Sequence, residues 1–242
     1  MTYDRLTHGP ILATLVSFAA PNAIALCSSA VITICETVYV GFLGVPVLAG
    51  VTLVFPITML MQMLSGGAMG GAIAGAISRA LGAGDDRRAR ALAFTALVIG
   101  TMAGLGFAAL IWLFGPAAYR TLGGKGESLD AAILYSNMIA LGVVFIWTSN
   151  SMASIARGFG AMQVPAVVQL AAGLVQIGLG GGLAFGFGPL PRLGLVGVAL
   201  GQVSASMLSA LALFVFLRRP GRRVPLHLER GLLSRPLFTA IL

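Results

Sequence analysis

Glu36 is the one acidic residue that lies inside an apolar stretch of this sequence. The chain has 7 Asp and Glu residues in all, and the others lie in segments expected to be loops or tails. An ionisable side chain inside a membrane costs about 2.5–3.5 kcal/mol on insertion scales, so its presence there indicates a function. Protonation relieves this cost because an apolar medium disfavours the charged form. Such a carboxyl group is suited to proton or cation exchange.

Several polar residues share a helical face with Glu36, as the 3.6-residue period of an α-helix requires. They are Asn22, Ser29, Thr33 and, one turn beyond Glu36, Tyr39. The alternative is that Glu36 lies near the end of its helix and only reaches the lipid headgroups. A stripe facing the interior of a helix bundle accounts better for the spacing, so we expect these side chains to line a cavity.

Uncharged polar residues in later apolar stretches extend this candidate cavity. The candidates are Asn150, Gln176 and Gln202. For any one of them, a helix–helix hydrogen bond that contributes about 0.6 kcal/mol is an equally good interpretation. Pro21 and Pro56 fall in the middle of apolar stretches, where proline removes a backbone hydrogen bond and bends a helix. Both a hinge and a static bend are open for these two prolines.

The composition is that of a membrane protein. Hydrophobic residues make up 58% of the 242 residues and charged residues 9%, whereas soluble domains carry about 25% charged residues. Apolar stretches long enough to span a bilayer as helices, with Glu36 as their one charged residue, cover residues of about 11–40, 47–77, 91–117, 131–156, 163–188 and 193–217. Membrane β-strands are shorter and alternate in polarity. We therefore expect an all-α integral membrane protein in which residues 11–217 form a bundle of six transmembrane helices.

Basic residues predict the orientation of this bundle. Of the 15 Lys and Arg residues, twelve fall on one side and three, Arg120, Lys125 and Arg192, on the other. Lys and Arg collect on the cytoplasmic side, so we expect a multi-pass protein of the plasma (inner) membrane with both termini in the cytoplasm. Residues 1–10 would be a cytoplasmic N-terminus and residues 218–235 a basic cytoplasmic segment. Residues 236–242 would begin an incomplete seventh apolar segment.

The sequence shows no pattern typical of an enzyme, a metal site or a nucleic-acid-binding protein. His8 and His227 are isolated, and no nucleophile and base are spaced as a catalytic pair. Cys27 and Cys35 have no partners at metal-ligand spacing. The basic residues lack interleaved aromatic residues or a recognisable nucleic-acid-binding module. We expect no enzymatic activity, no metal, no cofactor and no nucleic-acid partner.

Several short stretches, read in order, resemble the amino-terminal half of the multidrug and toxic compound extrusion (MATE) transporters. They are ICETVYVGFLG at 34–44, VFPITMLMQ at 54–62, SRALGAGDDRRARA at 78–91, IARGFGAMQVP at 155–165 and GFGPLPRLGLVGVALG at 186–201. The ordered set covers roughly residues 7–235. The resemblance implies one six-helix lobe of a twelve-helix transporter that exports organic, often cationic, compounds in exchange for H⁺ or Na⁺.

The resemblance also bears on individual residues. Glu36 matches an acidic position, usually aspartate, in the first helix of the family, which implies a role in proton or cation coupling. Many bacterial members have Asn and Asp where this chain has Gln176 and Gly180, so a second carboxylate is missing. Gln202 replaces a small hydroxyl residue that is common in the sixth helix.

The length of the chain leaves several functions open, because the family has twelve helices. The chain could pair with a copy of itself or with another half-transporter, and two lobes of six helices would insert with the same orientation. A lipid-linked oligosaccharide flippase is an alternative transporter, for which a broader cationic cavity would be expected. A truncated membrane fragment that does not transport is the alternative outside the transporter class. The expected contacts are membrane lipid and a small organic, cationic substrate.

Overall fold

The structure is a computed structural model, and every regular element in the residues that it describes is a helix. It describes residues 11–218, except for the side chains of residues 11–19, 21, 22, 25 and 26. The elements are α2 (Ile11–Phe42), α3 (Val45–Gln62), η1 (Met63–Ala68), α4 (Met69–Gly82), α5 (Asp86–Thr121), α6 (Gly126–Gly158), α7 (Gln163–Phe185) and α8 (Leu195–Arg218). Of the expected terminal segments, 1–10, 236–242 and all of 218–235 except Arg218 lie outside the described residues.

These elements make six long rods, because α3, η1 and α4 follow one another without a break. Five of the rods, from Val45–Gly82 to Leu195–Arg218, are long and apolar enough to cross a membrane. The side chains at the start of α2 are not all described, and the remaining stretch, Cys27–Phe42, is a shorter apolar helix. The predicted all-α, multi-pass membrane architecture is confirmed.

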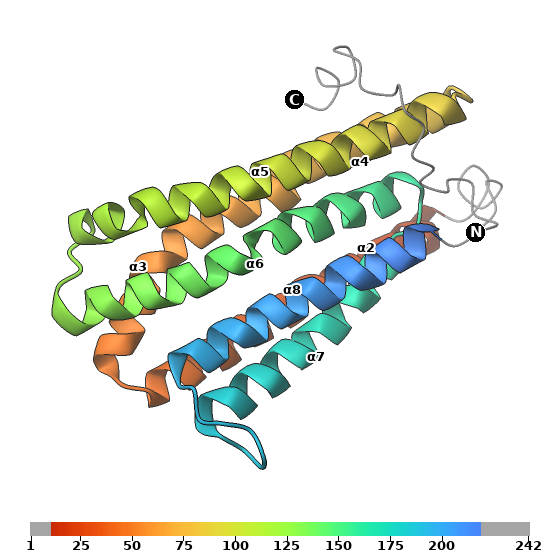
Figure 1. Cartoon of the computed structure of the whole chain (residues 1–242). Coiled ribbons are helices and arrows are strands. Elements are labelled where there is room, and N and C mark those ends of the chain that lie inside the picture. Colours follow the sequence, from red (N-terminus) through yellow and green to blue (C-terminus); the bar gives the residue numbers. More distant parts are fainter. Residues whose placement is uncertain (1–10, 219–242) are drawn as a thin grey trace.

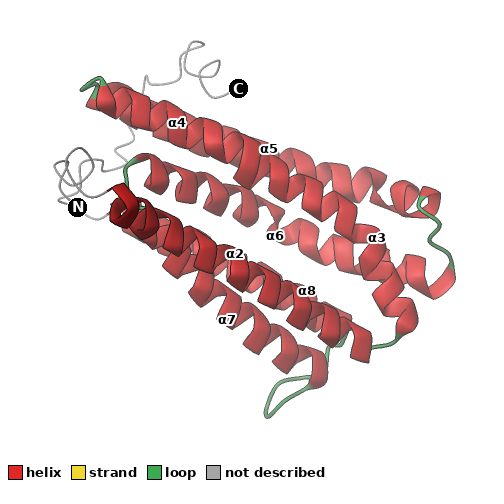
Figure 2. Ribbon diagram, turned by 180° about the vertical axis from the view of Figure 1, so that it is seen from behind, coloured by secondary structure: helices red, strands yellow, loops and turns green. Residues whose placement is uncertain are grey.

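Helix α6 lies at the centre of the bundle (Figure 1). It packs against α3, α4, α5 and α8, while α7 packs mainly against α8 and α2. Seen from behind, the helices run roughly along one common direction (Figure 2). Polar residues on α2, α3, α6, α7 and α8 can therefore meet inside one bundle.

Two hydrophobic clusters hold the bundle together. One contains Tyr135, Val143 and Trp147 of α6 with Val40 of α2 and Val54 of α3. The other joins the C-terminal parts of α4, α6 and α8 to the N-terminal part of α5, through residues such as Ile77, Leu92, Ile155 and Leu213. Large apolar side chains also cover the outside of the bundle, as Leu113 and Leu174 show with 73% exposure each. An apolar exterior is what a surface in contact with lipid requires.

A glycine after α4 and a side-chain cap at the start of α5 determine the turn between these two helices. Gly84 follows α4 with a φ of 75°, a left-handed conformation that glycine adopts without steric cost. The backbone N–H of Asp85 then returns to the carbonyl of Ala80 at 3.0 Å. The Asp85 side chain accepts a hydrogen bond from the Arg88 backbone N–H at 2.9 Å, which caps the start of α5.

Candidate functional site

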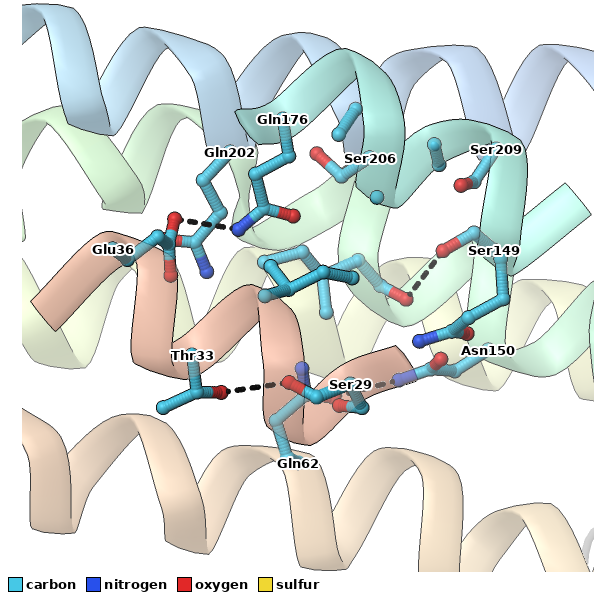
Figure 3. A pocket seen from close by; sticks show the side chains of 16 residues that line it. Ser29, Thr33, Glu36, Gln62, Ser149, Asn150, Gln176, Gln202, Ser206 and Ser209 are labelled. Atoms are coloured by element: carbon cyan, nitrogen blue, oxygen red, sulfur yellow. Dashed lines mark hydrogen bonds between the residues drawn. The ribbon is translucent and has the colours of Figure 1, made fainter. Parts of the chain in front are cut away.

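Two neighbouring cavities open among α2, α3, α6, α7 and α8. The first, here called the polar cavity, has a volume of about 170 Å³, and Figure 3 shows its walls. The second, here called the larger cavity, has a volume of about 410 Å³. Ser29, Thr33, Glu36, Gln62 and Gln202 line both. Three residues of the predicted polar face of the first helix, Ser29, Thr33 and Glu36, therefore line both cavities.

Glu36 accepts a hydrogen bond from α7. The Nε2 atom of Gln176 donates to Oε1 of Glu36 at 2.6 Å, and Figure 3 shows the two side chains pointing toward each other. A hydrogen bond to a charged group is about twice as strong as one between neutral groups. Glu36 is half-buried, and in the described part of the chain it is the one charged residue that lines either cavity. An organic cation or a small cation in these cavities would find its negative partner there.

Gln202 of α8 lies next to Glu36 on the wall shared by the two cavities. The hydroxyl of Tyr135 on α6 donates to Oε1 of Gln202 at 3.4 Å. The amide group of Gln202 also carries two N–H donors, which a bound ligand or ion-bound water could use. Helices α6, α7 and α8 thus each contribute one polar side chain near Glu36 of α2.

Asn150 of α6 forms a second polar group, at the side of the polar cavity away from Glu36. Its Nδ2 atom donates to the hydroxyl of Ser65 at 2.8 Å and to Oε1 of Gln62 at 3.2 Å. Ser65 belongs to the π-helical turn η1 and is fully buried. The Ser154 hydroxyl continues the chain of contacts by donating to the Asn150 carbonyl at 2.8 Å. Asn150 therefore joins the cavity wall to the irregular turn of the second rod.

The predicted residues are not all in the cavities. Thr33, Glu36, Asn150, Gln176 and Gln202 line one or both.

Tyr39 lies apart from this group: its ring meets the ring of Phe185 edge-on, with 5.8 Å between centroids. A methyl group at Gly181 would approach the Tyr39 ring to 2.9 Å, so Tyr39 packs tightly on α7. The side chains of Asn22 and Pro21 lie outside the described residues. Pro56 lies within α3, which continues through it.

Three residues that take part in the side-chain hydrogen bonds of the site were not predicted from the sequence: Gln62, Ser65 and Tyr135. Gln62 is a polar residue in an apolar stretch, so the reasoning applied to Gln176 could have found it. Ser65 and Tyr135 carry no such signal, because serine is common where membrane helices pack and tyrosine is common near the membrane interfaces.

Gly180 stands where many bacterial MATE transporters are expected to have an aspartate, and its position in the structure accounts for the glycine. A methyl group at Gly201 of α8 would lie 2.5 Å from the Cα atom of Gly180. Helices α7 and α8 therefore touch through their backbones at this point, as small residues permit in membranes. Gly180 contributes to packing, and the carboxylate of the site comes from Glu36 alone among the described lining residues.

Comparison with known sequences identifies related proteins. The family described as MatE matches residues 21–180. An FAD transporter of Shewanella oneidensis is 26% identical over 215 residues, which cover 88% of this chain and 46% of the relative. The multidrug export protein MepA of Staphylococcus aureus is 23% identical over 233 residues, or 96% of this chain and 51% of the relative. The chain thus spans about half the length of these curated relatives.

Comparison with solved structures gives the same proportion. A MOP superfamily transporter from Pyrococcus furiosus superposes with a TM-score of 0.87 and 23% sequence identity. The match covers 100% of this chain and 52% of that one. The fold of the described helices is therefore that of half of such a structure, as the sequence motifs indicate.

Proposed function

Because the chain belongs to the MatE family of membrane transporters, we propose that it forms one lobe of a secondary active antiporter. In this proposal the transporter exports organic, chiefly cationic, compounds in exchange for protons or sodium ions. MatE proteins are transporters and not enzymes, in agreement with the absence of catalytic motifs noted above. Since the chain spans about half of its relatives, the working transporter would include a second lobe.

One observation supports this proposal above the others: a single carboxylate, Glu36, lies between two cavities and is held by Gln176 at 2.6 Å. A carboxylate that a proton, a sodium ion and a cationic substrate can each neutralise is able to bind them in alternation. Exchange follows because the partner that arrives displaces the one already bound. Glu36 is the proposed coupling residue, and Thr33, Asn150, Gln176 and Gln202 would contact the substrate or the ion.

The walls of the cavities favour this function over a lipid-linked oligosaccharide flippase. Such a substrate carries phosphate groups, which arginine and lysine bind. Among the described residues, neither cavity has a Lys or Arg in its lining. A cavity with one carboxylate and several amides fits a cation better than a phosphate ester.

The test is uptake of a fluorescent organic cation into proteoliposomes, first under a proton gradient and then under a sodium gradient. We expect Glu36→Gln to abolish gradient-driven uptake, because the amide has about the same shape but cannot carry the charge. Glu36→Asp should keep part of it. Glu127→Gln, at an exposed acidic residue of α6 outside both cavities, serves as the matched control.

Normal gradient-driven uptake by Glu36→Gln would contradict the coupling role. Uptake by the chain alone would indicate that copies of it supply both lobes. Uptake only when a second MatE half is added would indicate that the second lobe comes from a different chain. If correctly inserted protein shows no uptake in either case, the antiporter proposal is wrong.

A further inference from the structure

We propose that the two cavities form one bipartite site for an amphipathic organic ammonium ion whose head group carries several hydroxyl or amide groups. The head group would occupy the polar cavity and the apolar body the larger cavity. This inference rests on the proposed function in one respect only, that these cavities bind the organic cation. It adds a substrate class defined by hydrogen bonding as well as by charge.

The volume of the polar cavity suits a head group and not a whole substrate. Ligand pockets of proteins usually measure about 300–1,000 Å³, and the polar cavity has about 170 Å³. The larger cavity, at about 410 Å³, falls within the usual range. Because the same five side chains line both cavities, the two adjoin at Glu36, and we place the head group of the ligand in the polar cavity and its body in the larger one.

The walls of the polar cavity are built for hydrogen bonding. Five amide side chains line it, together with hydroxyl groups from α2, α6 and α8: the amides are Gln62, Asn150, Gln169, Gln176 and Gln202. Gln169 and Ser209 make no hydrogen bond to any other side chain in the part of the chain that the structure describes. A ligand can therefore bind these two groups without breaking an existing contact.

The larger cavity has a different character. Its part away from the shared wall is lined mainly by apolar side chains, among them Val40, Leu48, Val51, Phe55 and Met59. Burial of an alkyl or aromatic group against them contributes about 25 cal/mol per Å² of apolar surface. Glu36 lies at the junction, where it would face a cationic nitrogen placed between head and body.

Simple quaternary ammonium ions fit such a site poorly. Their methyl groups offer no donors or acceptors, so binding removes water from the amides of the polar cavity and gives nothing in return. An unsatisfied polar group that loses water costs about 1–3 kcal/mol. Sites that bind a hydroxyl or amine by hydrogen bonds reject analogues that lack it for this reason. The head group therefore decides between two cations with the same tail.

Two permanently charged ligands with the same hexyl tail test this directly. One is hexyltrimethylammonium, whose head group has no hydrogen-bonding group. The other is N-hexyl-N,N-dimethylglucammonium, whose head group carries several hydroxyl groups that can each donate and accept hydrogen bonds. Their dissociation constants are measured by calorimetry on the chain in nanodiscs, without any gradient. We expect the hydroxylated ligand to bind about tenfold more tightly, which corresponds to one or two net hydrogen bonds.

Two substitutions localise this preference. Gln169→Leu and Ser209→Ala should each reduce the ratio of the two dissociation constants, and together they should bring it close to one. Gln163→Leu and Ser204→Ala are the matched controls, on the same helices but outside both cavities, and should leave the ratio unchanged. Phe55→Ala should weaken both ligands equally, because it removes apolar contact only from the body.

Equal binding of the two ligands by the unmodified chain would overturn the proposal, and so would a failure to bind either one. It would also be overturned by a preference that survives in the double variant, provided that the variant keeps its helical circular dichroism. A clear preference in binding, without gradient-driven uptake either by the chain alone or with a second MatE half, would contradict the antiporter and leave the bipartite site standing. The two proposals can therefore fail separately.

Discussion

At the scale of single residues, the contact between Glu36 and Gln176 is the feature on which the proposed coupling depends. In the described residues, Gln176 is the one side chain that donates a hydrogen bond to this carboxylate. Hydrogen bonds to charged groups contribute about 1.5–3 kcal/mol. We expect Gln176→Leu to lower gradient-driven uptake by about tenfold or more, because the carboxylate loses the group that orients it. Uptake rates in proteoliposomes measure this.

The control for this variant is Gln163→Leu, an exposed glutamine at the start of the same helix. It changes the same chemical groups outside the cavities and should leave the uptake rate unchanged. If Gln176→Leu transports as fast as the unmodified protein, the hydrogen bond does not contribute to coupling.

Asn150 allows a prediction about stability. Its amide is the partner of the fully buried Ser65 hydroxyl, and Asn150→Ala removes that partner. A buried polar group left unsatisfied costs about 1–3 kcal/mol, so the melting temperature in detergent should fall. Asn137→Ala, on the same helix but away from both cavities, should change it little. An equal melting temperature for the two variants would show that Ser65 finds another partner.

The sequence alone identifies Glu36 but not its partner. A carboxyl group in an apolar stretch is conspicuous, because charge inside a membrane segment is rare. Gln176 lies 140 residues further along the chain, and no local pattern shows which of several polar residues reaches Glu36. Tyr39 shares the helical face of Glu36 in the sequence, yet it packs on α7. Helical periodicity gives a face, and only the packing of neighbouring helices decides which part of that face is open.

At the scale of elements, α7 and α8 are held together through glycines. A methyl group at Gly201 would lie 2.5 Å from the Cα atom of Gly180 and 2.9 Å from the carbonyl oxygen of Gln176. Backbone atoms cannot move aside as a flexible side chain can, and overpacking costs about 1–3 kcal/mol. We therefore expect Gly201→Ala to lower the melting temperature and to weaken the contact of Gln176 with Glu36.

Gly178→Ala is the matched control, since a methyl group at that position of α7 meets nothing within 4 Å. Its melting temperature should equal or exceed that of the unmodified protein, because alanine is the better helix former. Equal stability of the two alanine variants would contradict the close approach of α7 and α8.

The long helices follow from the sequence, but their irregularities do not. Continuous apolar stretches of about 20 residues must satisfy their backbone groups as helices in lipid. The π-helical turn Met63–Ala68 has no such cause in the sequence. It lies where Asn150 binds Ser65, and π-helical turns are frequent at functional sites. A long-range contact of this kind becomes visible only in the folded bundle.

At the scale of the whole molecule, five of the helices line the cavities, and the others contribute only to the packing of the bundle. Helices α2, α3, α6, α7 and α8 supply the lining residues, whereas α4 and α5 pack on α6. The chain corresponds to about half of the related structure from Pyrococcus furiosus. One lobe can therefore contain the proposed ion-coupling and head-group sites, while the change of access between the two sides of a membrane would require two lobes to move against each other.

Charge predicts how this lobe lies in the membrane. Arg87, in the first turn of α5, belongs to the end of the bundle that carries most of the described arginines. Lys125 lies at the opposite end, just before α6. Because Lys and Arg are retained on the cytoplasmic side, Arg87 should face the cytoplasm and Lys125 the exterior.

A membrane-impermeant maleimide on intact cells tests this orientation. Single cysteines are introduced by Arg87→Cys and Lys125→Cys, both at exposed positions, after Cys27→Ser and Cys35→Ser remove the two native thiols. We expect labelling of Lys125→Cys on intact cells, and labelling of Arg87→Cys only after the membrane is permeabilised. The reverse pattern would place the polar cavity toward the exterior, because Asn150 and Gln169 lie nearer the arginine-rich ends of their helices. The proposed head-group site would then face the side from which an exported compound leaves.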